Sequence, residues 1–157
     1  MIGKLTPKEI EEVLTKNMLG RIGCNDGYNT YVIPINYVYD GKYILAHSQL
    51  GLKIQIMRQN PRVCFEVDEI VNFNHWKSVI VLGNYLELIT ERDRYNAMKF
   101  FIGRMLHVKI SKTAMPGEIY ANYASTSETS ELTQTAKPII YRINIEEKSG
   151  RFEKESL

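Results

Sequence analysis

Residues 30–60 constrain the fold more than any other stretch, because two strand patterns, a tight turn and a helix start follow one another without interruption. From Tyr31 to Val38, β-branched and aromatic side chains alternate with others, which is typical of a β-strand. Asp40-Gly41 supplies the φ > 0 residues that a two-residue hairpin requires, and Lys42 to Ala46 has the pattern of the returning strand. The stretch therefore predicts an antiparallel hairpin.

A helix is predicted directly after this hairpin. Leu50, Ile54 and Met57 recur at helical spacing, and Asn60-Pro61 ends the pattern. The junction at 47–53 reads HSQLGLK, so a hydroxyl, a glycine and a lysine lie beside the free N–H groups of a helix N-terminus. This combination favours an anion such as a phosphate monoester. An ordinary capped helix with a surface lysine explains the same spacing equally well.

The remaining strand patterns give a predicted total of six strands. Short connections between consecutive strands require antiparallel pairing, and many strands with few helices favour a small closed barrel over a parallel sheet. Thr6-Pro7-Lys8-Glu9 and Thr90-Glu91-Arg92-Asp93 predict the starts of two flanking helices. The six predicted strands are Met18–Cys24, Tyr28–Tyr39, Lys42–Ala46, Arg62–Val71, Ser78–Ile89 and Pro138–Ile145.

Four places in the chain are predicted to be irregular. Asn72–Lys77 reads as a loop, Gly83 as a bulge within its strand, and Glu146–Gly150 as a turn. Residues 106–137 lose any period, and Ser, Thr and Glu dominate their second half. A loop of this length in a compact domain is usually functional or disordered, so we expect a lid over or beside a binding pocket.

Composition and charge narrow the class of protein. With 157 residues, 44% of them hydrophobic, residues 1–157 suit a single domain with a substantial core. A net charge of +2 is too small to indicate nucleic-acid binding. No leader pattern and no apolar run of membrane-spanning length is present in the sequence, so a cytoplasmic protein is expected. Cys24 and Cys64 lie in apolar segments and read as buried free thiols in a reducing compartment.

Several kinds of chemistry have little support in the sequence. His47, His75 and His107 are far apart, with neither cysteine at ligand spacing, so no metal site is expected. Neither a nucleophile-elbow motif nor a glycine-rich dinucleotide loop occurs. Glu66 and Asp68 point the same way along a strand and could act as a carboxylate pair, but a polar strand face explains them more simply.

Five motifs in colinear order resemble the FMN-binding split-barrel family of pyridoxamine 5′-phosphate oxidase, and most nearly its branch of nitroimidazole-resistance reductases. The motifs are P-I-N-Y, D-G, H-S-x-x-G-x-K, N-P-R-V-C-F-E-V-D and W-K-S-V-I-V-L-G. The resemblance runs from about Leu5 to Met105, with a weaker echo from Ile139 to Arg151. It implies a mainly β (α+β) fold, a six-stranded antiparallel split β-barrel with flanking helices, that binds FMN.

The resemblance also implies a set of site residues. Ser48 and Lys53 would hold the FMN phosphate, with Gly51 allowing close approach of the backbone. His47 would lie near the flavin as the candidate catalytic residue, although a structural histidine at a strand end is an equally good interpretation. Two further segments would contact FMN, the second of them from the partner subunit of a homodimer with FMN at its interface: Val32, Ile33, Pro34, Ile35 and Asn36, and Trp76, Lys77, Ser78 and Val79.

The chain departs from the pyridoxamine phosphate oxidases proper in two places. Thr30-Tyr31 stands where a basic residue is expected, and the C-terminal arginine motif is reduced to Lys148-Ser149-Gly150-Arg151. We therefore expect an FMN-dependent oxidoreductase that reduces nitroaromatic or quinone-like small molecules. The alternatives are a pyridoxamine 5′-phosphate oxidase-like enzyme, which needs a second phosphate site, and a non-catalytic module that binds flavin or haem.

Overall fold

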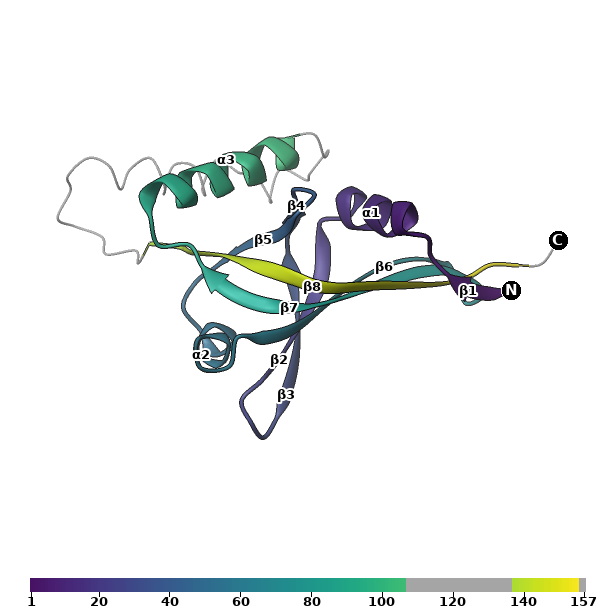
Figure 1. Cartoon of the computed structure of the whole chain (residues 1–157), viewed down its shortest axis with the longest axis horizontal. Helices are drawn as coiled ribbons and strands as arrows, with labels where there is room; N and C mark the ends of the chain where they lie inside the picture. Colours follow the sequence, from purple (N-terminus) through teal and green to yellow (C-terminus); the bar gives the residue numbers. More distant parts are fainter. Residues whose placement is uncertain (107–136, 156–157) are drawn as a thin grey trace.

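A computed structural model describes residues 1–106 and 137–155 of the chain (Figure 1). Within these residues one antiparallel sheet has eight strands, in the order β3-β2-β6-β7-β8-β5-β4, and β1 pairs with β8. The elements are β1 (Ile2–Lys4), α1 (Pro7–Lys16), β2 (Leu19–Asn25), β3 (Thr30–Asn36), β4 (Val38–Tyr39), β5 (Tyr43–Ser48), α2 (Leu52–Gln59), β6 (Arg62–Asn72), β7 (His75–Glu87), α3 (Glu91–Leu106) and β8 (Ile139–Glu153). The predicted antiparallel β fold with flanking helices is confirmed.

Helix α1 begins where the sequence predicts. The Thr6 hydroxyl oxygen accepts a hydrogen bond from the backbone N–H of Glu9, and the Glu9 carboxylate accepts one from the backbone N–H of Thr6 at 2.8 Å. These reciprocal bonds form a capping box that satisfies two of the free N–H groups at the helix start. Ile10, Val13 and Leu14 form the buried face of the helix.

Tyr37 marks the corner at which the sheet turns back on itself. Strands β3 and β4 lie at opposite ends of the strand order, yet only Tyr37 separates them in the chain. Its side chain is fully buried, packs edge-on against Phe65 at 4.7 Å between ring centroids, and donates a hydrogen bond from its hydroxyl to the Leu14 carbonyl. A continuous chain thus joins the two sheet ends. In the described part of the chain no ladder pairs them, so the barrel is split, and the expected full closure is wrong.

The strand boundaries differ from the predicted ones at both ends of the β7–β8 ladder. Strand β7 already begins at His75, so the loop predicted at 72–77 is reduced to a tight turn between β6 and β7. Strand β8 continues to Glu153, so the turn predicted at 146–150 is wrong. The charged run there has a strand conformation because it pairs with β7 and β1, a non-local effect that composition does not reveal. Together with the separate β1 and β4, this gives eight strands where six were predicted.

A bulge occurs beside Gly83, but its extra residue lies on the partner strand β8 and not within β7 as predicted. Leu82 pairs with Glu147 and Gly83 with Ile145, so Glu146 is an extra residue on β8. A Cβ atom at Gly83 would clash with the backbone oxygen of Asn144 and would lie 2.9 Å from Cγ2 of Ile143. Glycine is therefore required by the close approach of the two strands.

Two hydrophobic clusters lie on opposite faces of β5 and β8. The larger fills the barrel beneath α1 and α2, and includes Leu14, Tyr37, Phe65 and Tyr141. The smaller lies beneath α3 and includes Leu45, Met98, Phe101 and Ile140. Helix α3 therefore covers the outer side of the same strands whose inner side lines the barrel (Figure 1).

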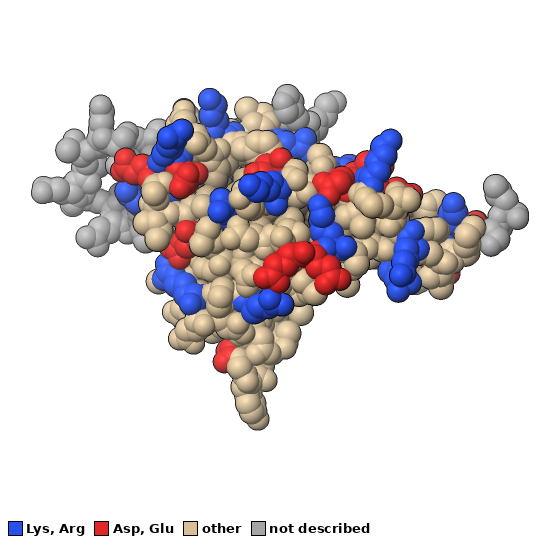
Figure 2. Space-filling model, viewed as in Figure 1, with Lys and Arg blue, Asp and Glu red and all other residues tan. Residues whose placement is uncertain are grey.

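Residues 107–136 of the predicted loop lie outside the described residues, so its role as a lid stays a prediction. No helix in the described ranges is long and apolar enough to cross a membrane. The face drawn in Figure 2 intersperses basic and acidic side chains, without a broad area of one sign.

Candidate functional site

The junction between β5 and α2 has the geometry of an anion site. Helix α2 begins after Gly51, whose extended backbone occupies the N-cap position without a side-chain hydrogen bond to the helix. The first turn contains no acidic residue. The N–H groups and the positive end of the helix dipole are therefore not compensated by a side chain of the helix itself. The helix starts two residues later than predicted, at Leu52, and ends at Gln59 as expected.

Open space lies beside the glycine at this junction. A Cβ atom built at Gly51 would meet no atom within 4 Å, and the flanking side chains of Leu50 and Leu52 are exposed. Ser48, three residues earlier, donates its hydroxyl to the carbonyl of Gln49 at 2.8 Å. A phosphate bound here could approach the backbone directly, and Ser48 would have to rotate from its present bond to contact it.

Lys53 adds a positive charge to the same place. Its ammonium forms no ion pair with any carboxylate of the described residues. Its proximity to two titratable groups is reflected in their pKa values, since Lys53 lowers the pKa of His47 and opposes the increase that burial causes in the pKa of Cys24. The Lys53 ammonium therefore lies near the ends of β2 and β5, and no described carboxylate is within ion-pair distance of it.

His47 lies on the other face of β5 from Ser48. His47 pairs with Ile140 of the outer cluster, whereas Ser48 pairs with Ile139 of the barrel core. The imidazole packs edge-on against Phe101 of α3, with the ring centroids 4.9 Å apart. Burial, and to a smaller extent Lys53, lowers the pKa of His47. The structure thus gives His47 a fixed, neutral environment under α3, and it does not bring the imidazole to the same face as Ser48.

Strand β3 presents alternate side chains to solvent and to the barrel. Val32, Pro34 and Asn36 are exposed, Ile35 is buried, and Ile33 packs against the core. Ile33 and Ile35 can therefore contact a cofactor only through their backbone. Since β3 pairs with β2 alone in the described part of the chain, the backbone groups on its outer side are available for such contacts.

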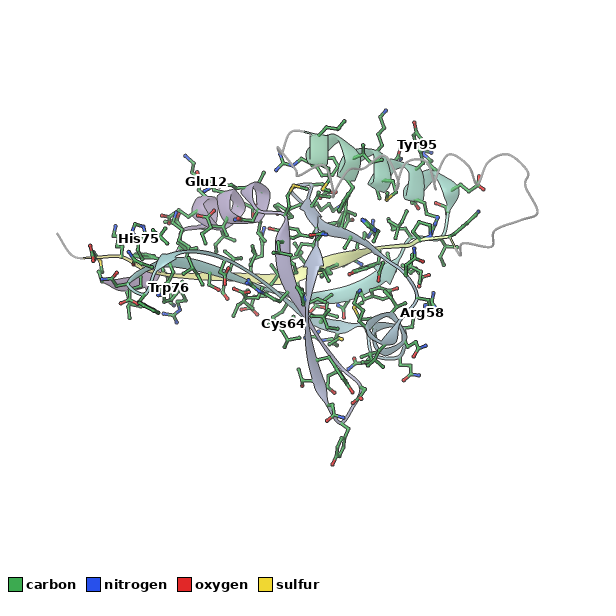
Figure 3. The ribbon with its side chains drawn as sticks, turned by 180° about the vertical axis from the view of Figure 1, so that it is seen from behind. Glu12, Arg58, Cys64, His75, Trp76 and Tyr95 are labelled. Atoms are coloured by element: carbon green, nitrogen blue, oxygen red, sulfur yellow. The ribbon has the colours of Figure 1, made fainter. Side chains whose placement is uncertain are left out.

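The segment from Trp76 to Val79 lies far from the junction at 47–53 of the same chain. Figure 3 shows Trp76 at one end of the molecule and Arg58 of α2 towards the other. The Trp76 indole donates to the Glu153 carboxylate at 3.0 Å, and Ser78 donates to Glu66 at 2.8 Å. Lys77 is half-buried, and Val79 is fully buried in the barrel core, so its side chain cannot reach a ligand. The segment could complete a site at the junction only from a second chain.

Arg21 is a site-relevant residue that sequence reasoning did not single out. It contacts both Glu66 and Asp68, with N–O distances of 3.1 Å. The hydrogen bond that Arg21 donates to the Asp68 carboxylate is the largest cause of the raised pKa of Arg21. The two carboxylates are therefore neutralised together, which opposes an acid–base pair. The alternation of Arg21 with Ile22 in the sequence indicates that Arg21 lies on the polar face of the predicted strand. Its contact with Glu66 depends on the pairing of β2 with β6, which the sequence does not show.

The cysteines and histidines of the described ranges form no metal-binding group. No three or more His, Cys, Asp or Glu side chains are placed there to share an ion. Cys24 faces the barrel core, whereas Cys64, which pairs with the neighbouring Gly23, faces the opposite side of the sheet. Side chains on opposite faces of a sheet cannot form a disulfide without movement of the backbone.

Comparison with solved structures places the fold among known proteins. A crystal structure of a FAD-binding protein from Mesorhizobium loti is 30% identical in sequence, with 98% of this chain and 99% of that chain covered at a TM-score of 0.71. A structure described as a 5-nitroimidazole antibiotic resistance protein, from Bacteroides thetaiotaomicron, is 14% identical, with 97% and 87% covered at a TM-score of 0.69. At that identity the second match shows the fold alone.

Sequence comparison gives the family. An uncharacterized protein of Rhizobium meliloti is 34% identical over 84 residues, and the match spans 54% of this chain and 56% of that relative, about half the length of each. The family model described as pyridoxamine 5′-phosphate oxidase matches residues 6–152, nearly the whole chain. The chain therefore belongs to the pyridoxamine 5′-phosphate oxidase family.

Proposed function

We propose that this protein binds FMN at the β5–α2 junction and uses it as an oxidoreductase of small nitroaromatic or quinone-like molecules. The observation that carries the proposal is the combination of an uncapped helix N-terminus, open space beside Gly51 and a lysine without a described counter-ion. Each of these favours a phosphate, and FMN ends in one. The FAD-binding relative from Mesorhizobium loti supports a flavin in general.

We propose FMN in preference to FAD as the flavin at this junction. One helix N-terminus and one lysine suit a single terminal phosphate, whereas FAD would continue from this point through a second phosphate to an adenosine. Bound FMN would supply the hydride and electron transfer, and the protein would supply binding, orientation and a dry pocket. Lys53 and the N–H groups of α2 would hold the phosphate, and the outer backbone of β3 would be free to bond the flavin ring.

His47 is the candidate for proton handling. Its lowered pKa keeps the imidazole neutral near pH 7, so that one ring nitrogen can donate and the other accept a hydrogen bond. Packing against Phe101 fixes the plane of the ring. A fixed neutral imidazole can hold a substrate or pass a proton without the cost of first losing a charge.

A second copy of this chain is proposed to complete the site. On one face of the sheet, residues paired across β3, β2, β6 and β7 form two rows. The apolar side chains of Val32, Ile80 and Leu82 in these rows are exposed. At its far end the β6–β7 turn presents a fully exposed Phe73 close to Trp76. A homodimer that buries this face would cover the apolar rows and could bring the Trp76 end of one chain to the β5–α2 junction of the other.

Oxidation of vitamin B6 is a weaker candidate for this chain. This reaction needs a second phosphate site. In the reduced C-terminal motif, the basic residues are Lys148 and Arg151. The Lys148 ammonium pairs with the Glu11 carboxylate and donates to the Tyr39 hydroxyl at 3.2 Å. Lys148 is thus committed to fastening α1 to the sheet, which leaves Arg151 alone for a substrate phosphate.

FMN titration of the flavin-free protein, followed by quenching of flavin fluorescence, tests the site. Lys53→Ala should weaken FMN binding by about ten- to a hundredfold, because one charge-assisted contact contributes about 1.5–3 kcal/mol. Lys8→Ala, which removes an exposed lysine of α1, is the matched control and should leave the affinity unchanged. Equal FMN affinity in the two variants would show that Lys53 does not bind the FMN phosphate. Tighter binding of FAD than of FMN would identify FAD as the cofactor.

Turnover and assembly are tested separately. The FMN-loaded protein, reduced by an external donor, should be reoxidised by a nitroaromatic or quinone acceptor faster than free FMN is. Light scattering of the same sample should give the mass of a dimer. Absence of turnover above free FMN with every donor and acceptor pair would leave a flavin-binding module, and an FMN-loaded monomer would exclude the shared site.

A further inference from the structure

A second cavity lies between α3 and the hairpin formed by β4 and β5, away from the proposed flavin site. Its volume is about 310 Å³, within the lower range of small-ligand pockets. None of its lining residues belongs to the β5–α2 junction, to the flavin-facing part of β3 or to the Trp76 segment. The residues that line it are Asp40, Tyr43, Leu45, Leu88, Asp93, Asn96, Ala97, Phe100 and Arg142.

Arg142 is the cation of this cavity, and it forms no ion pair within the described residues. Its Nε atom is buried and has no hydrogen-bond partner, and no carboxylate of the described chain lies within ion-pair distance. The terminal N–H groups of a guanidinium that has no ion pair favour an anionic ligand that can accept their hydrogen bonds.

The guanidinium of Arg142 lies over an aromatic ring. Its Cζ atom lies 4.0 Å from the centre of the Tyr43 ring. A cation–π contact of this kind uses none of the N–H groups of the guanidinium as hydrogen-bond donors, so the terminal N–H groups can still bind an acceptor. A planar carboxylate can accept two parallel hydrogen bonds from these groups.

Two acidic residues of the cavity wall are committed to local structure. The Oδ1 atom of Asp40 accepts hydrogen bonds from the backbone N–H groups of Lys42 and Tyr43, at 2.8 and 2.6 Å. The Asp93 carboxylate accepts the Thr90 hydroxyl at 2.7 Å at the start of α3. They do not neutralise Arg142, but their charges oppose a dianion. The cavity therefore suits a monoanion better than a phosphate.

The rest of the wall is apolar. Leu45, Leu88 and Ala97 are buried, and Phe100 is partly exposed on the cavity side of α3. We propose that this cavity binds a small aromatic monocarboxylate, whose ring packs on the apolar wall and whose carboxylate pairs with Arg142. Phe100 lines the cavity and its neighbour Phe101 packs on His47, so one turn of α3 contacts both this ligand site and the candidate catalytic histidine.

Isothermal titration calorimetry with 2-naphthoate tests the proposal, with the uncharged 2-naphthamide as the matched ligand. The wild-type protein should bind naphthoate at least about tenfold more tightly than naphthamide, because only the acid can form the charge-assisted pair. The affinity should be unchanged when the protein is saturated with FMN. Equal affinity for the two ligands, no naphthoate binding, or displacement of naphthoate by FMN would each overturn the proposal.

Two variants and a control locate the binding. Arg142→Gln should weaken naphthoate binding by about tenfold or more, whereas Arg92→Gln, which removes an exposed arginine of α3 that does not line the cavity, should not. Asn96→Trp places a large ring at the exposed rim and should block binding with Arg142 intact, which keeps the test decisive if Arg142→Gln fails to fold. Unchanged naphthoate affinity in Asn96→Trp would place the ligand elsewhere and refute the assignment.

Discussion

Replacement of Tyr37 by phenylalanine tests whether the corner residue holds the split barrel together. The substitution keeps the ring and its edge-on contact with Phe65, and removes only the hydroxyl that donates to the Leu14 carbonyl at 2.9 Å. That carbonyl belongs to the last turn of α1, where backbone oxygens have no partner within the helix. Tyr37→Phe therefore leaves a buried acceptor without its donor.

The expected cost follows from this orphaned oxygen. A buried polar group that loses its partner costs about 1–3 kcal/mol, more than the net value of an ordinary hydrogen bond. For a chain of this size, each kcal/mol lowers Tm by about 2–4 °C, so Tm should fall by about 2–12 °C. Burial raises the pKa of Tyr37, so the hydroxyl keeps its proton and the bond persists well into alkaline solution.

Thermal unfolding followed by circular dichroism measures the effect, and urea unfolding gives the free energy. Tyr28→Phe is the matched control, since Tyr28 is 92% exposed and its hydroxyl forms no hydrogen bond with the described residues. That control should change stability by less than about 0.5 kcal/mol. Equal Tm values for the two variants would refute the view that the Tyr37 hydroxyl fastens α1 to the corner of the sheet.

Three further predictions concern the bulge and the histidine. Gly83→Ala should lower the free energy of unfolding by about 1–3 kcal/mol, because the new Cβ atom would clash with Asn144. Gly23→Ala is the control and should be neutral or slightly stabilising, because its Cβ would lie no closer than 3.5 Å to its neighbours. Similar urea midpoints for the two variants would contradict the tight strand contact at Gly83. Because the folded pKa of His47 is lowered below the ordinary value of about 6.5, His47 contributes stability that is present above that pH and lost as pH falls through the folded pKa. Wild type should therefore lose more stability than His47→Gln between about pH 7.5 and pH 5, and parallel pH profiles from urea unfolding would exclude this role. If His47 transfers a proton, His47→Ala in the FMN-loaded protein should lower turnover by about 10²–10⁴-fold while FMN stays bound. Stopped-flow reoxidation of the flavin measures this rate. A loss below about threefold would mean that His47 has a structural role only.

Local features of the fold could be predicted from local residues. The capping box at Thr6 and the end of α2 at Gln59 each depend on side chains within a few positions of one another. The hairpin at Asp40-Gly41 is also present, but only Gly41 adopts a positive φ, of 92°. Asp40 instead accepts the backbone N–H groups that follow it, a contribution of its side chain that the dipeptide pattern does not distinguish.

The missed features depend on contacts between distant segments. The extension of β8 through Glu146–Gly150 requires β7 as a partner, and the burial of Gly150 requires Leu5 and Ile10 of the N-terminal segment. In the same way, the contact of His47 with Phe101 is created by α3 folding over β5, more than fifty residues along the chain. Composition and period could not reveal these contacts, because the residue types involved occur equally in unpaired segments.

Pro34 has a consequence for how this protein behaves at high concentration. In the described part of the chain, Pro34 lies in the middle of β3, at an edge of the sheet, beside an exposed Val32. An unprotected edge of this kind could template the addition of strands from other molecules and so begin aggregation. Proline has no N–H to offer to an incoming strand, and it is tolerated in a sheet where that missing donor would face outward. Pro34 therefore protects this edge of the sheet from growing by strand addition.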